Sequence, residues 1–259
     1  MRLPIIRGII DRRILVNYRV DPEVLASLLP APFRPVTIQG HGMAGICLIR
    51  LKQIRPRFLP GFVGTTSENA AHRIAVQWEQ NGELHEGVYV PRRDTSSRLN
   101  TLLGGRLFPG VHHFGRLQVR GRDGHYSVRL NGGDGVYLTV EGSRTSKWPE
   151  HSVFGTIEQA SDFFERGAVG YSPTALTGVS GHESEFEGLE LRTANWHVEP
   201  LTIESVASSY FENEQIFPKG SVEFDSALLM RGIRHEWHVC PPIACCEDVE
   251  TAGYSSGCR

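Results

Sequence analysis

The chain has 259 residues, of which 40 % are hydrophobic, and its formal net charge is −2. This length suits one large domain or two small ones, and the apolar fraction is enough to bury a core. The small net charge excludes a global electrostatic attraction to nucleic acid or to membranes. Three of the 27 basic residues are lysines, so few amines are present for lysine chemistry: they are Lys52, Lys147 and Lys219.

The N-terminus predicts a protein without a secretory signal. Residues 1–6 have no long apolar segment followed by a small-residue cleavage site. No run of about 18 apolar residues occurs anywhere, so no transmembrane helix is expected. Four of the five cysteines fall in the last twenty residues, which is not the spacing of a disulfide framework. We therefore expect a reduced, cytoplasmic protein.

The first part of the chain predicts strands around one short helix. Asp21 and Pro22 form a helix start, with the aspartate as N-cap and the proline at the first helical position. This helix is expected to end near Leu29. Residues 55–66 are rich in proline and glycine and predict a loop. The strands expected in this part are residues 9–20, 33–38 and 43–54.

The segment from Glu68 to Gly110 carries most of the unusual chemistry. A strand starting at Glu68 places every second side chain on one face. That face holds Glu68, Ala70, His72, Ile74, Val76 and Trp78. Its far end is apolar, whereas its near end carries a carboxylate and an imidazole. Arg73 faces the other way and is expected to be a solvated charge.

A hairpin is predicted next, because Asn81-Gly82 is typical of a type I′ turn. The return strand places Val88, Val90, Arg92 and Asp94 on one face. Residues 95–103 are then expected to form a short helix that ends at Gly104-Gly105.

The remainder predicts more hairpins and two helices. The helices are residues 156–166, with an apolar face, and residues 202–211. The strands are residues 111–120, 126–130, 136–141, 184–199 and 222–239. We find no internal repeat and no composition break. Residues 1–246 are therefore predicted to form a single domain, with residues 247–259 as a loose tail.

This pattern predicts a mainly β (α+β) fold. Many β segments are joined by short glycine turns, and helices are inserted singly. We expect a mainly antiparallel sheet system that closes or nearly closes into a β-barrel or double sheet, with a few peripheral helices.

Several short motifs carry a resemblance to a known superfamily. They are Glu68-Asn69 before a strand, Gly87-Val88-Tyr89, Gly105-Arg106 followed by Pro109, residues 196–201 and residues 225–237. With these motifs the chain resembles the acetoacetate-decarboxylase-like superfamily, and within it the YqjF-like branch, whose members are mostly of unknown function. The resemblance implies a decarboxylase-like barrel.

The chain departs from that superfamily at its reactive lysine. The resemblance implies a Pro-Lys-Lys type segment after Gly-Arg, in which one lysine forms a Schiff base with a keto acid and is activated by a neighbouring cation. Here Pro109 is followed by Gly110-Val111-His112-His113, and the chain has no adjacent lysines. The three lysines are expected at the surface. Schiff-base decarboxylation of acetoacetate is therefore not expected.

Two groups of polar residues are candidates for a site. Glu68 and His72 suit an acid/base pair, and the alternative is a structural role for both. Arg92, Arg93 and Arg106 suit a carboxylate clamp, because a guanidinium binds a carboxylate in a bidentate fork. The resemblance favours Arg106. The alternative for at least one of the other two is pairing with acids such as Asp94.

Metal, nucleotide and nucleic-acid sites are not expected. His112 and His113 are adjacent, and His235 and His238 are three apart, so neither pair can chelate from a regular strand. The three cysteines near the C-terminus, Cys240, Cys245 and Cys246, lack the spacing of zinc sites. The glycine-rich residues 131–135 lie between strands, as a hairpin turn does, and not before a helix. Basic patches with interleaved aromatic residues are absent from the sequence.

These observations predict an interior pocket for a small organic acid or carbonyl compound, in a lysine-independent, lyase-like enzyme. Glu68 or His72 would handle protons, and Arg106, Arg92 and His113 would bind the substrate. The alternative is a non-catalytic binding or sensing module that kept the barrel and lost the lysine. No cofactor is expected. The sequence leaves the ligand and the oligomeric state open, with a homo-oligomer among the options.

Overall fold

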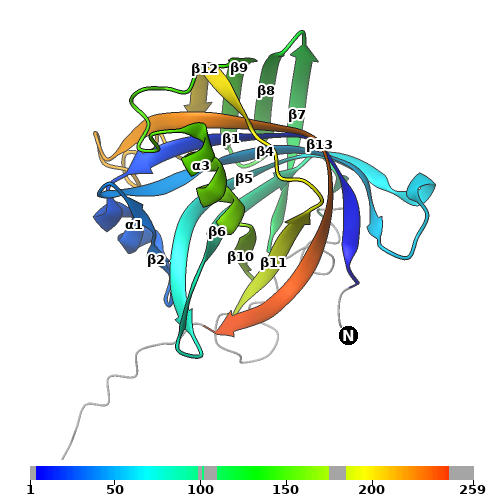
Figure 1. The fold of residues 1–259 in the computed structure, drawn as a ribbon, viewed down its shortest axis with the longest axis horizontal. Coiled ribbons are helices and arrows are strands. Elements are labelled where there is room, and N and C mark those ends of the chain that lie inside the picture. The colour runs from blue at the N-terminus through cyan, green and yellow to red at the C-terminus, as the bar shows by residue number, and fades with distance from the viewer. Residues whose placement is uncertain (1–3, 99–100, 102–109, 175–184, 245–259) are drawn as a thin grey trace, which may run out of the picture.

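The computed structural model describes residues 4–98, 101, 110–174 and 185–244. As expected, the fold is mainly β, with two α-helices in the described part (Figure 1). The strands are β1 (Ile6–Val20), β2 (Arg34–Pro35), β3 (Thr37–Ile38), β4 (His41–Pro56), β5 (Thr65–Gln80), β6 (Glu83–Thr95), β7 (His112–Arg122), β8 (His125–Gly132), β9 (Tyr137–Arg144), β10 (Val169–Pro173), β11 (Glu185–Thr193), β12 (Glu199–Ser208) and β13 (Val222–Ala244). The helices are α1 (Pro22–Leu28), α3 (Ile157–Arg166) and the 3-10 turn η1 (Gly61–Val63).

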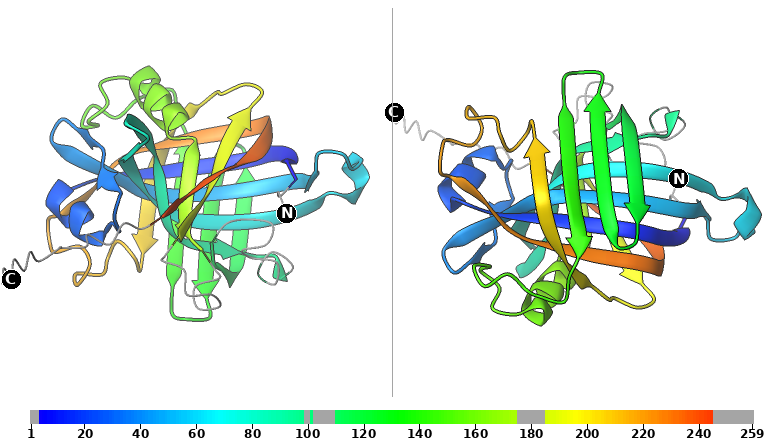
Figure 2. Two further views of the ribbon diagram at one scale, coloured as in Figure 1. Left: turned by 90° about the horizontal axis from the view of Figure 1, so that it is seen from below. Right: turned by 90° about the horizontal axis from the view of Figure 1, so that it is seen from above.

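Hydrogen bonding between strands closes into a ring. In order around it, the members are β13, β1, β4, β5, β6, β10 and β11, and β11 pairs again with β13. We call these strands the ring. A second path leaves β6 through β7, β8, β9 and β12 and returns to β13. Figure 2 shows β7, β8 and β9 crossing the longer strands steeply.

The nearly closed architecture agrees with the sequence expectation, but the sheet is mixed. β6 pairs in parallel with both β10 and β7, whereas its pairing with β5 is antiparallel. Most pairings are antiparallel, as expected, and the two parallel ones could not be predicted, because the sequence shows hairpins between neighbours but not the pairing of distant strands.

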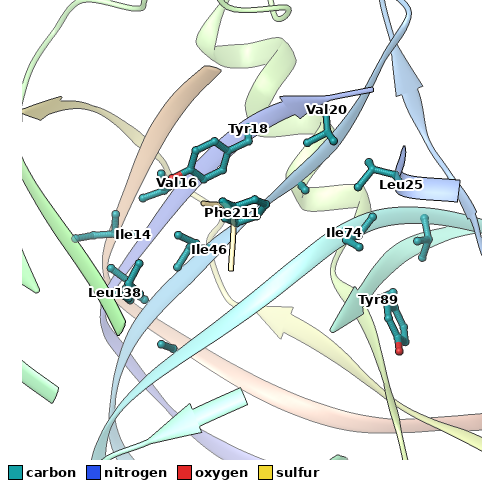
Figure 3. Close-up of a cluster of buried hydrophobic side chains, with 14 of the residues drawn as sticks. Ile14, Val16, Tyr18, Val20, Leu25, Ile46, Ile74, Tyr89, Leu138 and Phe211 are labelled. Atoms are coloured by element: carbon teal, nitrogen blue, oxygen red, sulfur yellow. The ribbon is translucent and has the colours of Figure 1, made fainter. Parts of the chain in front are cut away.

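The main core fills the space between the long strands and the β8–β9–β12 layer. Every second side chain of β1 points into it, including Ile14 and Val16, because side chains alternate along a strand. Figure 3 shows these residues facing Leu138 of β9, with Ile46 and Phe211 between the layers. This arrangement leaves the opposite face of β1, β4 and β5 to pack elsewhere.

That opposite face packs against α3. Thr156 caps the helix by accepting a hydrogen bond from the Gln159 amide, as the sequence predicts. Phe163 and Phe164 are buried with Leu15 of β1 and with residues of β4 and β5 in a second apolar cluster. β1, β4 and β5 are therefore buried on both faces, and α3 covers part of their inner face.

Some sequence expectations were wrong. Residues 202–211, expected as a helix, form β12 up to Ser208, because pairing with β9 satisfies their backbone groups. The expected loop at residues 55–66 is shorter, since β4 extends to Pro56 and β5 starts at Thr65. The α1 start at Asp21 is confirmed, with its side chain accepting from the Glu23 amide.

The tail at residues 247–259 and the predicted helix end at Gly104-Gly105 lie outside the described residues. No helix in the part that the structure describes is both long and apolar enough to cross a membrane.

Candidate functional site

A cavity of about 150 Å³ lies inside the ring. Each of the seven ring strands contributes at least one lining residue, and His112 of β7 and two residues after α3 complete the wall. A single water needs roughly 10–15 Å³ of such volume. The cavity therefore has room for a small organic molecule.

Three guanidinium groups line this cavity: those of Arg13 on β1, Arg73 on β5 and Arg93 on β6. Arg73 is buried, with 6 % of its surface exposed, which corrects the expectation of a solvated charge. Both faces of β5 are covered. A side chain that points away from the main core therefore points into the cavity side of the ring and not into solvent.

The contacts of these arginines are mostly with neutral groups. Arg73 Nη2 donates a hydrogen bond to Asn17 Oδ1, and its guanidinium lies 4.6 Å from the centre of the Phe164 ring. Arg93 Nε donates to Ser172 Oγ at 3.1 Å. Neutral oxygens and a ring face leave most of the positive charge uncompensated.

Arg13 completes the set. Its Nε lies 3.3 Å from Cys47 Sγ, and its guanidinium carbon lies 5.9 Å from the centre of the Trp196 ring. Cys47 itself lines the cavity. The wall near this thiol is therefore cationic.

No carboxylate among the described residues forms an ion pair with Arg13, Arg73 or Arg93. Asp94 is the one acid in the described lining, and both of its oxygens accept hydrogen bonds from Arg92. The cavity therefore carries an excess of positive charge.

Burial changes the ionisation of the lining groups. It lowers the pKa of Arg73 and of Arg93 to about 10, and a nearby negative charge at Cys47 would oppose that shift. Both arginines stay charged at neutral pH. Burial, with the Arg93 charge beside it, lowers the pKa of His112 to about 4, so His112 is neutral there.

Glu68 and His72 share one face of β5, as the sequence predicts, but neither is in the described lining of the cavity. Apart from Ala70, the residues of β5 in the described lining belong to the opposite face: Asn69, Ala71 and Arg73. Glu68 Oε2 lies 2.6 Å from Arg12 Nη2, and its other oxygen lies 3.6 Å from Arg50. The carboxylate is therefore held in an ion-pair network.

His72 lies in the main core and is 1 % exposed. Its Nε2 is 3.4 Å from Ser208 Oγ, and its ring lies 4.7 Å from that of Tyr210. Burial, aided by the charge of Arg92, lowers the pKa of His72 to about 4. His72 is thus a neutral core residue at physiological pH.

Arg92 and His113 meet at Asp134, outside the described lining of the cavity. Arg92 contacts Asp94 at 2.8 Å and Asp134 at 2.7 Å, and His113 Nδ1 lies 3.9 Å from Asp134 Oδ2. Arg92 is therefore paired with acids, which was the alternative to its role in a carboxylate clamp. Arg106, together with Cys245 and Cys246, lies outside the described residues.

None of the three lysines, all of which are described, is in the described lining. Lys52 pairs with Asp11 at 2.7 Å, and Lys147 and Lys219 are exposed. Among the residues that the structure describes, no three His, Cys, Asp or Glu side chains cluster as metal ligands.

Sequence reasoning missed Arg13, Arg73 and Cys47. A usable signal was present on β5: the face of Arg73 also carries Ala71 and Ala75, whose short side chains leave space beside the long one. Small residues beside an isolated charge on a two-sided buried strand indicate a cavity better than a cluster of polar residues does.

Solved structures with the same fold were found at low sequence identity. An acetoacetate decarboxylase from Legionella pneumophila has a TM-score of 0.62 at 12 % identity, covering 93 % of this chain and 88 % of that one. An acetoacetate decarboxylase-like enzyme from Sphingomonas wittichii RW1 has a TM-score of 0.57 at 15 % identity, with coverage of 92 % and 91 %. The enduracididine biosynthesis enzyme MppR, complexed with pyruvate, has a TM-score of 0.53 at 13 % identity, with coverage of 95 % and 91 %.

No functionally curated protein matches the chain. The DUF2071 family, described as an uncharacterized conserved protein (COG2071), matches residues 10–162, which is more than half of the sequence. The chain therefore belongs to the DUF2071 family and has the acetoacetate-decarboxylase-like fold.

Proposed function

We propose that this protein binds a small organic carboxylate in the cavity of the ring, with Arg13, Arg73 and Arg93 as the groups that hold the anion. The observation that carries this proposal is the set of three guanidiniums in one cavity without a carboxylate partner among the described residues. A buried charge is costly unless it is paired. A bound carboxylate would supply the missing partner.

The size and shape of the cavity favour a small ligand. About 150 Å³ suits a few non-hydrogen atoms, and the rest of the lining includes apolar side chains such as Val90, Leu189 and Leu191. A compact acid with a short apolar or carbonyl-bearing part fits such a lining. The pyruvate in the MppR complex belongs to this chemical class and suggests pyruvate as a first probe.

Two classes of protein remain candidates, a lysine-independent enzyme and a non-catalytic binding or sensing module. Their common step is binding of the anion. Borohydride treatment with a keto acid separates them in part, because a trapped adduct would require a reacting lysine. Turnover without trapping favours the enzyme, and saturable binding without turnover favours the module.

The binding step is tested by calorimetric titration with pyruvate and acetoacetate. Arg93→Gln removes a charge but keeps a hydrogen-bonding side chain, and we expect it to weaken binding by roughly 10- to 100-fold, as for loss of a charged hydrogen bond. The matched control is Arg122→Gln, since the Arg122 side chain is 92 % exposed.

Equal affinity in wild type and Arg93→Gln, with both proteins folded by thermal unfolding, would contradict the assignment of Arg93. Absence of saturable binding of any small carboxylate to wild type would contradict the proposed function itself.

A further inference from the structure

The cavity contains one nucleophilic side chain that the binding proposal does not use. Cys47 lies on β4, is a free thiol and is 9 % exposed. Its position in the sheet is fixed by pairing with Leu15 of β1 and Ala71 of β5. Both neighbouring strands thus hold the sulfur at the cavity wall.

The surroundings of Cys47 are cationic on several sides. Arg13 Nε lies 3.3 Å from Sγ. Arg73 and Arg93 both interact electrostatically with the sulfur. The one acid in the described lining, Asp94, is bound to Arg92. An anionic reagent entering the cavity would therefore collect beside this thiol.

A second observation points to a ligand at the same place. Arg73 is more than nine-tenths buried, lines the cavity, and its Nε has no hydrogen-bond partner among the described groups. This side chain also forms no ion pair with a described carboxylate, so an anion bound in the cavity of about 150 Å³ would supply the counter-charge that it lacks. Thiol, uncompensated positive charge and space are thus present together.

We propose that Cys47 is a nucleophile that adds reversibly to the keto carbon of a small 2-oxo carboxylate held by the arginines. This inference rests on the proposed anion-binding function and goes beyond it by assigning a covalent step. A carboxylate bound by the guanidiniums would bring its adjacent carbonyl carbon towards the sulfur.

The step balances without an oxidant or a reductant. The S–H bond of Cys47 breaks and a C–S bond forms, while the π electron pair of the carbonyl moves to oxygen. The proton from sulfur ends on that oxygen and gives a hemithioketal.

The electrostatic part is tested with iodoacetate and iodoacetamide, which have similar size but different charge. The rate of alkylation at Cys47 is measured for each reagent by peptide mass spectrometry, and the iodoacetate rate is divided by the iodoacetamide rate. The same ratio for glutathione serves as the reference. We expect the folded protein to favour iodoacetate by about tenfold or more relative to glutathione. Arg13→Gln should reduce this preference, Arg122→Gln should leave it unchanged, and unfolding in urea should abolish it.

The covalent part is tested by NMR with pyruvate labelled with carbon-13 at its keto carbon. We expect a new tetrahedral-carbon signal with wild type, and no such signal with Cys47→Ser. Bound pyruvate without the tetrahedral signal would overturn the covalent step and leave the binding function standing. No bound pyruvate or other 2-oxo acid at all would count against both. An alkylation ratio equal to that of glutathione would also overturn the inference.

Discussion

Arg73 on β5 donates a hydrogen bond to Asn17 on β1 across the intervening strand β4. Gly45 lies between them, paired with Asn17 on one side and with Arg73 on the other. The missing side chain of Gly45 opens the path, since a Cβ there would come within 3.3 Å of Arg73 Nη2. Three residues far apart in sequence thus fix one wall of the cavity.

Gly45→Ala should therefore destabilise the protein and displace Arg73. The added Cβ would also lie 2.4 Å from the backbone oxygen of Val16, so the β1–β4 pairing must shift. We expect a loss of about 1–3 kcal/mol, typical of overpacking, measured by urea unfolding. Gly133→Ala is the control, because nothing lies within 4 Å of its Cβ position. Equal stability of the two variants would contradict this account.

Glu68→Gln should reduce stability without weakening carboxylate binding. It leaves Arg12, which is 6 % exposed, without its 2.6 Å partner. We expect a loss of about 2–4 kcal/mol for this largely buried pair. Glu141→Gln is the control, because its partner Arg129 is 59 % exposed and solvent screens such a surface pair, so its loss should change stability much less.

Calorimetric titration of the same Glu68→Gln protein with pyruvate distinguishes a structural role of Glu68 from a role in ligand binding. If the folded variant loses pyruvate binding as Arg93→Gln does, Glu68 acts in the site after all.

The stability of the protein should fall as the pH falls from about 6.5 towards 4. Burial lowers the pKa of His72 to about 4 from 6.5, so the unfolded state binds a proton in this window before the folded state does. His235, 3 % exposed, has a similarly lowered pKa. Stability is therefore complete above pH 6.5 and decreases below it, by up to about 1.4 kcal/mol per pH unit for each group.

The measurement is urea unfolding at pH 7.5 and pH 5 for wild type and His72→Gln. The variant should lose less stability between the two conditions, whereas substitution of the exposed His41 should not change the difference. An unchanged pH dependence in His72→Gln would show that His72 is not the titrating group.

Much of the fold could be predicted from the sequence, because its strands alternate and its turns use glycine. The hairpin at Asn81-Gly82 and the cap at Asp21 are local signals, and both appear in the structure. A closed or nearly closed sheet was predicted, but the strands that close it could not be, because β11 and β13 are not neighbours in the chain. The error at β12 has the same origin, since sheet pairing outweighed local helix preference.

The site was harder to predict than the fold. Alternation correctly put His72 and Arg73 on opposite faces, but it does not say which face borders a cavity when both faces are buried. Arg92 and Arg93 show the same difficulty: one is paired with Asp94, and its neighbour reaches the cavity. Arg92 also pairs with Asp134, a contact that the local sequence does not show.

The most direct test of the central claim is a titration of wild-type protein with pyruvate and with pyruvamide, its neutral amide. The two are similar in size and shape, so their difference in affinity measures the contribution of the carboxylate charge. We expect saturable pyruvate binding that is at least about tenfold tighter than pyruvamide binding, the margin expected for a charged hydrogen bond. Equal affinities for the acid and the amide would contradict an arginine-lined anion site.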